Sequence, residues 1–260
     1  MISQAATVES HAPFRGGEAD LQPWTWVREG ADIYRRHVLL SVGYGLLFVL
    51  IGYVILLSLG SIGLVAAMPV AFGAFALAGP LMAAGLYGIA RADEEGQRPS
   101  FSEVLLPKAA SPMQILYLGV IILVAMMMWT IVAIGLFVIF LGSSISGWEA
   151  FAQFVLSTPE GIAMLVIGTL TGGVIAAAIF ATTAFSIPML MDRETDFATA
   201  IASSVGAVLS RPKQMFLWAW IIVLSVAVGA ATFMVGFVFL FPLLGFATWR
   251  GYRSVFPPAS

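Results

Sequence analysis

The stretch VLLSVGYGLLFVLIGYVILLSL, residues 38–59, decides the fold of this chain. It contains no Asp, Glu, Lys or Arg, and only its two serines and two tyrosines carry polar side-chain atoms. About 20 helical residues cross roughly 30 Å of hydrocarbon at 1.5 Å per residue. A run of this length and polarity is therefore predicted to be a membrane-spanning helix.

The composition of the whole chain supports the same interpretation. Of 260 residues, 60% are hydrophobic and 10% are charged, and the mean hydropathy is +0.98. A soluble domain carries roughly 25% charged residues. The net charge of −2 gives no reason to expect nucleic acid as a partner. With no cysteine in the chain, disulfides, thiolate metal sites and cysteine nucleophiles are excluded.

Uncharged runs predict six spans arranged as three hairpins. The runs are 37–90, 109–148, 161–191 and 214–249. The first is long enough for two spans, near 38–59 and 63–90, the second of them interrupted by Pro69 and Pro80. The next two runs give one span each, about 114–141 and 161–191. Ser157 and Glu160 have the spacing of a capping box before the latter.

The run 214–249 fits two alternatives, one long helix or a hairpin that turns near 229–236. A single crossing would place Arg250 and Arg253 outside, whereas a hairpin returns them to the cytoplasm, as the positive-inside rule favours. With the hairpin, all 12 Lys and Arg residues fall on one side and the outer segments hold only Glu149 and Glu160. We therefore expect a multi-pass protein of the bacterial inner membrane with both termini in the cytoplasm.

A sequence match predicts an internal repeat. SPMQILY at 111–117 corresponds to RPKQMFL at 211–217, and each copy follows a short amphipathic stretch. Pro80, Pro188 and Pro242 each precede an arginine by a few residues. These features predict three units of an interfacial helix followed by a hairpin, at 23–98, 99–194 and 195–253, within one membrane domain of residues 23–254. In the third unit, the apolar face of the interfacial helix comprises Phe197, Ile201, Val205, Val208 and Leu209.

Two further segments have their own predictions. Residues 1–22 lack the apolar core of a signal peptide and are expected to form a disordered cytoplasmic tail. Residues 146–157 place Trp148, Phe151, Phe154 and Val155 on one stripe, which predicts either a helix on the outer membrane surface or an outer loop packed on the bundle.

The residues that might carry chemistry are few. The chain has two histidines, His11 and His37, and no predicted span contains a charged residue. Haem–copper sites and intramembrane proteases need ligands or partners that these spans lack. We expect no catalytic, cofactor-binding or metal-ligating residue, and no ligand-binding residue is identified. The acidic groups near 93–95 and 192–196 are expected to form ion pairs with neighbouring arginines; a divalent metal is the alternative.

Polar and small residues cluster in the fourth span. Thr182, Thr183 and Ser186 precede Pro188, so they either form a small ligand site or satisfy the backbone groups that the proline frees. Gly168 and Gly172 define a small-residue face, which predicts packing within the monomer or, alternatively, homodimerisation. Trp129 lies in the middle of a span and is expected to pack in the core.

Several motifs resemble a family of uncharacterised prokaryotic integral membrane proteins defined by a domain of unknown function. Some members are labelled putative cytochrome c oxidase subunits. The resemblance extends over about 24–254, and it implies a membrane protein with no assigned activity or site. Histidine is common in that family near the positions of Phe246 and Arg250, and its absence here argues against a metal or redox role. The motifs are AGPL at 78–81, GLY at 85–87, TPEG at 158–161, PMLMDR at 188–193 and PLLGFATW at 242–249.

These features favour a non-catalytic membrane protein, an accessory, assembly or scaffolding component of a larger complex. Its expected partners are the lipid bilayer and other membrane-protein subunits. The alternative is a permease or channel for a small neutral or apolar solute, which the prolines and the repeat would serve. A lipid-handling protein is a third hypothesis, and an enzyme is the last.

Overall fold

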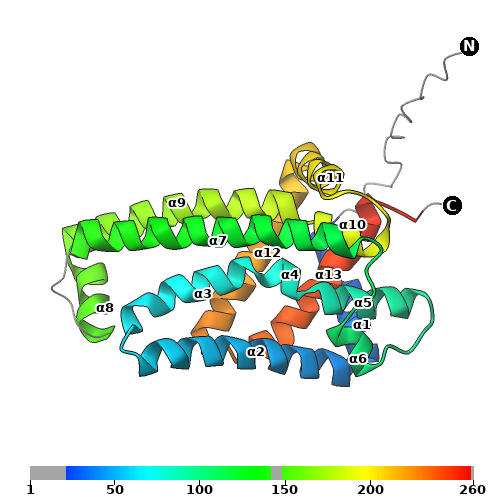
Figure 1. Cartoon of the computed structure of the whole chain (residues 1–260), viewed down its shortest axis with the longest axis horizontal. Coiled ribbons are helices and arrows are strands. Elements are labelled where there is room, and N and C mark those ends of the chain that lie inside the picture. Colours follow the sequence, from blue (N-terminus) through cyan, green and yellow to red (C-terminus); the bar gives the residue numbers. More distant parts are fainter. Residues whose placement is uncertain (1–21, 142–147, 259–260) are drawn as a thin grey trace, which may run out of the picture.

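A computed structural model describes residues 22–141 and 148–258, and within them the chain is all-α (Figure 1). The all-α prediction is thus confirmed. The predicted tail, except for its last residue, and the start of the predicted outer helix at Ser146 lie outside the described residues.

The helices follow one another in an order that occurs three times: a short helix, a long helix, and a return helix that contains a break or an internal proline. The first set is α1 (Pro23–Arg36), α2 (Val38–Ser61), and the return made by η2 (Val65–Ala67), α3 (Met68–Leu77), α4 (Gly79–Met82) and α5 (Ala84–Glu94). The second is α6 (Phe101–Leu105), α7 (Pro112–Leu141), α8 (Trp148–Ser157), α9 (Pro159–Thr183) and α10 (Ser186–Asp192). The third is α11 (Phe197–Ser210), α12 (Pro212–Ala231) and α13 (Phe237–Val255).

Four helical segments of the described chain are long and apolar enough to cross a membrane: Val38–Ser61, Pro112–Phe140, Pro159–Asp192 and Pro212–Ala231. The second predicted span, 63–90, is not one helix. It begins only at Met68, where Pro69 starts the first turn rather than interrupting the ladder, and it breaks again around Gly79–Pro80. The predicted cap Ser157 is also wrong, because the side chain of Thr158 accepts the hydrogen bond from Gly161 N.

The run 214–249 forms two helices, α12 and α13, joined by a turn at 232–236. Phe233 and Met234 adopt positive φ in this turn. Thr232 Oγ1 accepts a hydrogen bond from Gly236 N at 2.9 Å, and Tyr53 on α2 donates its hydroxyl to the Phe233 carbonyl. The turn therefore lies where a hairpin was predicted. Hydrogen bonds within the turn and to α2 hold it in place.

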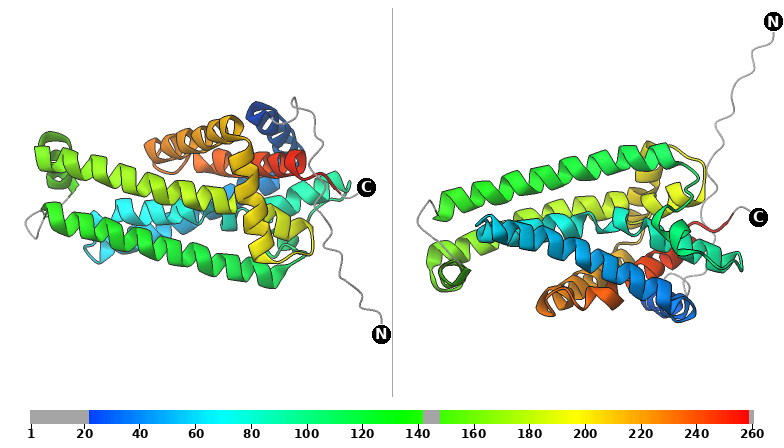
Figure 2. Two further views of the ribbon diagram at one scale, coloured as in Figure 1. Left: turned by 90° about the horizontal axis from the view of Figure 1, so that it is seen from above. Right: turned by 60° about the horizontal axis from the view of Figure 1, so that its bottom comes forward.

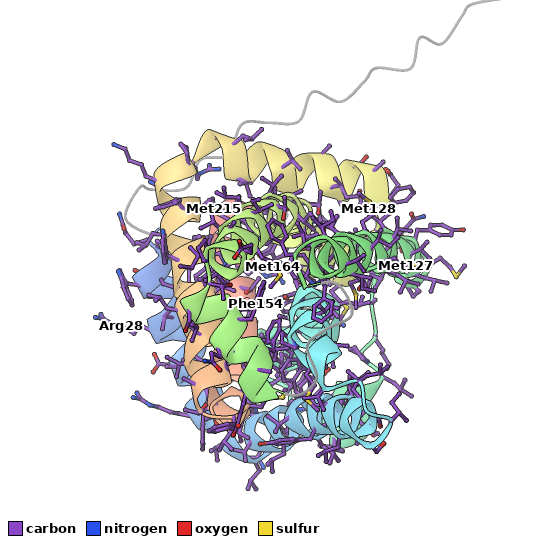
Figure 3. The ribbon with its side chains drawn as sticks, turned by 90° about the vertical axis from the view of Figure 1, so that its left-hand side faces the viewer. Arg28, Met127, Met128, Phe154, Met164 and Met215 are labelled. Carbon is purple, nitrogen blue, oxygen red and sulfur yellow. The ribbon has the colours of Figure 1, made fainter. Side chains whose placement is uncertain are left out.

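The helices form a bundle with one helix pair at its edge (Figures 1 and 2). α7 and α9 run side by side, α8 folds back at their tip, and α3 lies against α7. Met127 and Met128 on α7 point outward and are each 56% exposed (Figure 3). α1 and the last turn of α13 lie together at the other end, which we call the charged end (Figure 1).

The core lies where the three return helices meet, near the charged end. Its largest fully buried side chains come from α1, α5, α12, α13 and the segment around α10. They are Trp26, Leu86, Tyr87, Phe185, Ile187, Trp218, Phe246, Trp249 and Tyr252, each 2% exposed or less.

Candidate functional site

Arginines join the three return helices to one another at the charged end. Arg91 on α5 donates to the carbonyls of Met191, in α10, and Lys108, both at 2.6 Å. Arg193, directly after α10, donates to the carbonyl of Phe256, directly after α13, at 3.3 Å. Arginine suits this role because its planar guanidinium presents several donors in a fixed geometry.

A third arginine contact links the last return helix back to the first. Arg253 on α13 donates Nε to Glu94 Oε2, at the end of α5, at 2.9 Å. The three arginines thus connect the return helices in a cycle. Arg91 links the first return helix to the second, Arg193 links the second to the third, and Arg253 links the third to the first. Each return helix also contacts the short helix of the next set in this cycle: α5 contacts α6, α10 contacts α11 and α13 contacts α1.

Carboxylates at the charged end are partly buried and accept hydrogen bonds from neighbouring side chains. Asp192 accepts the Tyr252 hydroxyl at 2.6 Å and Arg253 Nη1 at 2.8 Å, and its side chain is 11% exposed. The Arg253 guanidinium also lies 4.8 Å from the centre of the Trp249 ring. Burial is the main cause that raises the pKa of Tyr252, and the hydrogen bond to Asp192 raises it further. The hydroxyl therefore stays protonated and donates.

A second group ties the start of α2 to α5. Asp93 accepts two hydrogen bonds from Arg36, at 2.8 and 2.6 Å, and lies 2.9 Å from His37 Nε2. The bond from Arg36, reinforced by His37, holds the pKa of Asp93 below its usual value. The same bond raises the pKa of Arg36.

The predicted pairs with neighbouring arginines are confirmed for Glu95 and Asp192, whereas Asp93 and Glu94 pair with arginines distant in the sequence. Glu95 lies 3.9 Å from Arg91, whereas Asp196 caps α11 by accepting from Thr199 N. Within the described ranges, no three His, Asp or Glu side chains gather as a metal-binding group. The arrangement holds the ends of the helices together.

The polar segment before Pro188 is satisfied by protein atoms. Thr182, Thr183 and Ser186 each donate a hydroxyl to a carbonyl three or four residues earlier in the same segment. Ser204 on α11 donates to the Ala181 carbonyl at 2.8 Å and accepts from Phe185 N at 3.1 Å. At the break itself, Ser186 binds the Thr182 carbonyl and Ser204 binds the Ala181 carbonyl and the Phe185 amide, whereas Thr182 and Thr183 bond to carbonyls inside α9. The prediction that hydroxyls here satisfy backbone groups freed at the break is therefore confirmed only for Ser186.

Ser204 is the residue that the sequence interpretation missed. The buried residues of α11 are Ala200, Ser204 and Ala207, whereas Leu209, assigned to its apolar face, is 71% exposed. Small residues allow helices in a membrane to approach closely, while large apolar side chains face lipid at no cost. The spacing of these three small residues was the available signal.

α9 presents small residues on two adjacent sides. On one side, Gly172 accommodates Trp129, because a methyl group added at Gly172 would collide with the indole ring. Trp129 also donates Nε1 to the Val70 carbonyl at 3.3 Å, so it packs between α9 and α3, as predicted for a core residue. On the other side, Thr169, Gly173, Ala176 and Ala177 are exposed, and no atom lies within 4 Å of a methyl group added at Gly173.

Fold and site together define a multi-pass α-helical integral membrane protein. Residues 67–192, just under half of the chain, match a family described as Predicted integral membrane protein (DUF2189), whose function is unknown. The match is shorter than the expected 24–254. No curated protein and no solved structure match the chain.

Proposed function

We propose that this chain is a non-catalytic protein of the bacterial inner membrane that serves as an accessory, assembly or scaffolding component of a larger complex. It crosses the bilayer six times as three hairpins, with both termini in the cytoplasm. The bias of all 12 Lys and Arg residues and the turn between α12 and α13 support this topology.

The exposed small-residue side of α9, formed by Thr169, Gly173, Ala176 and Ala177, carries the proposal. Lipid gives no advantage to glycine and alanine, whereas a second helix gains close van der Waals contact from them. The adjacent side of the same helix shows what such residues do, since Gly172 receives Trp129 there. The exposed side therefore suits a transmembrane helix of another subunit.

A permease or channel needs a route through the bundle. The axis near the charged end is instead occupied by side chains such as Leu86, Phe185 and Phe246, all 0% exposed. Two apolar hollows in the described part of the chain are lined by residues of α2, α3 and α4 and by Met234, and neither includes Thr182–Pro188. These observations favour the scaffolding function over transport.

The neighbouring glycines of α9 provide a matched test. Gly173→Leu should leave the melting temperature of the purified protein unchanged, yet remove a stoichiometric partner that co-purifies with the wild type in mild detergent. Gly172→Leu should lower the melting temperature, because the new side chain displaces Trp129. Recovery of the wild type as a lone monomer, with no partner after crosslinking in the membrane, contradicts the proposal.

A further inference from the structure

An apolar hollow of about 130 Å³ lies between α2 and the break in the first return helix. Tyr44, Leu47, Phe48 and Ile51 of α2 line it together with Met82 at the end of α4. The α2 residues from 44 to 51 cover about 10 Å along the helix axis. Because α2 is long and apolar enough to cross a membrane, the medium that meets this hollow is lipid.

One end of the hollow is polar and adjoins α6. Tyr44 donates its hydroxyl to the Met82 carbonyl at 2.7 Å, at the break between α4 and α5. A methyl group added at Gly85 would lie 2.7 Å from this hydroxyl and would also collide with the carbonyl of Val104 on α6. A methyl group added at neighbouring Gly43 would lie 3.5 Å from the Phe101 ring. The mouth of the hollow toward the charged end is therefore bordered by α6.

α6 has the features of a helix at the membrane interface. Phe101, Leu105 and Leu106 are 47%, 45% and 82% exposed, which places apolar side chains toward the bilayer. Two cationic residues flank the helix, Arg98 and Lys108, and both are exposed. Long basic side chains near the ends of apolar segments reach for the headgroup region.

We propose that the hollow binds one acyl chain of an anionic phospholipid whose headgroup lies beside α6, near Arg98 and Lys108. The lining fits a hydrocarbon chain, and the flanking cations supply charge complementarity to a phosphate-bearing headgroup. This binding site is separate from the small-residue side of α9 and does not depend on the scaffolding function.

Native mass spectrometry of the purified full chain tests the site with defined lipids. The wild type should retain one phosphatidylglycerol in preference to phosphatidylcholine. Ile51→Trp fills the hollow and should abolish the retained lipid, whereas Leu50→Trp, on an exposed position of the same helix, should not. If Ile51→Trp does not fold, Leu47→Phe serves the same purpose.

The headgroup part is tested with neutral substitutions. Arg98→Gln and Lys108→Gln should each weaken the preference for phosphatidylglycerol about fivefold, the worth of one basic residue at an anionic surface. Arg28→Gln removes an exposed cation on α1, which points away from the bundle (Figure 3), and should leave the preference unchanged. Equal retention of the two lipids, or unchanged retention in the hollow-filling variants, overturns the proposal.

The identity of the occupant is checked with a photoreactive group. Because the chain has no cysteine, Ile51→Cys provides a unique attachment point for benzophenone. Illumination in membranes should add the mass of a phospholipid to the protein. A protein adduct at this position, from a second copy or another subunit, assigns the hollow to a helix instead and also overturns the proposal.

Discussion

Arg253 and Asp192 lie 61 residues apart in the sequence, and their side chains meet at 2.8 Å between Nη1 and Oδ2. The contact joins the last residue of α10 to the last turn of α13. Both side chains are largely buried, at 16% and 11% exposed. In this position the pair is shielded from water, so removing one partner costs more than breaking a surface ion pair does.

Replacement of Asp192 tests the importance of this contact. Asp192→Asn should destabilise the folded protein by about 2 kcal/mol, because it removes a charged acceptor from both Arg253 and Tyr252. Denaturant unfolding in mild detergent measures the change. Asp32→Asn, which breaks the exposed pair with Arg35, should have no measurable effect. Equal losses in the two variants contradict the prediction.

Asp93 predicts how stability changes with pH. Its folded-state pKa is lowered by Arg36, so the unfolded chain binds the proton more tightly. The stabilisation is therefore present above about pH 4, the value for an unfolded aspartate, and is lost as the pH falls through the lower folded value. Unfolding midpoints measured between about pH 6 and pH 3 should fall less steeply for Asp93→Asn than for the wild type. Parallel curves would show that Asp93 contributes nothing.

Ser204 should be essential to the packing of α11. Ser204→Ala leaves the buried amide of Phe185 without its acceptor, at a cost of about 1–3 kcal/mol. Ser210→Ala is the matched control, since that hydroxyl donates to a carbonyl in its own helix turn and accepts only an exposed bond from the adjacent Arg211. A melting curve for each variant decides the matter: the prediction fails if both variants melt with the wild type.

Membrane topology is accessible through reporters and single cysteines. A reporter fused after Ser260 should be active in the cytoplasm, and Gln153→Cys on α8 should react with an impermeant thiol reagent from outside. The first result follows from an even number of crossings and the second from the position of α8 at the tip of α7 and α9. A periplasmic signal from the fused reporter would mean an odd number of crossings and would remove the closing hairpin.

Much of the fold was predictable because the sequence marks it locally. The uncharged runs located the long helices, and the matching motifs at 111–117 and 211–217 begin α7 and α12, where Pro112 and Pro212 occupy the first turn. Proline also indicated the breaks near Gly79 and Pro188. These signals act within one or two helix turns, so a single sequence reveals them.

The candidate site was less predictable, because its partners are distant in sequence. No local pattern pairs Arg91 with the Met191 carbonyl, 100 residues away, or Arg253 with Glu94. The choice of Thr158 over Ser157 as the cap depends on one residue of backbone register. Such details are set when helices pack, and composition alone does not encode them.

The contact between α1 and α13 has a consequence for biogenesis. Gly30 of α1 lies against the backbone of Ala247, where an added methyl group would be 2.7 Å from the amide nitrogen, so the first helix completes its packing on the last. A nascent chain therefore emerges from the ribosome with its N-terminal helix still lacking its partner. A truncation before residue 237 should therefore be degraded rather than accumulate.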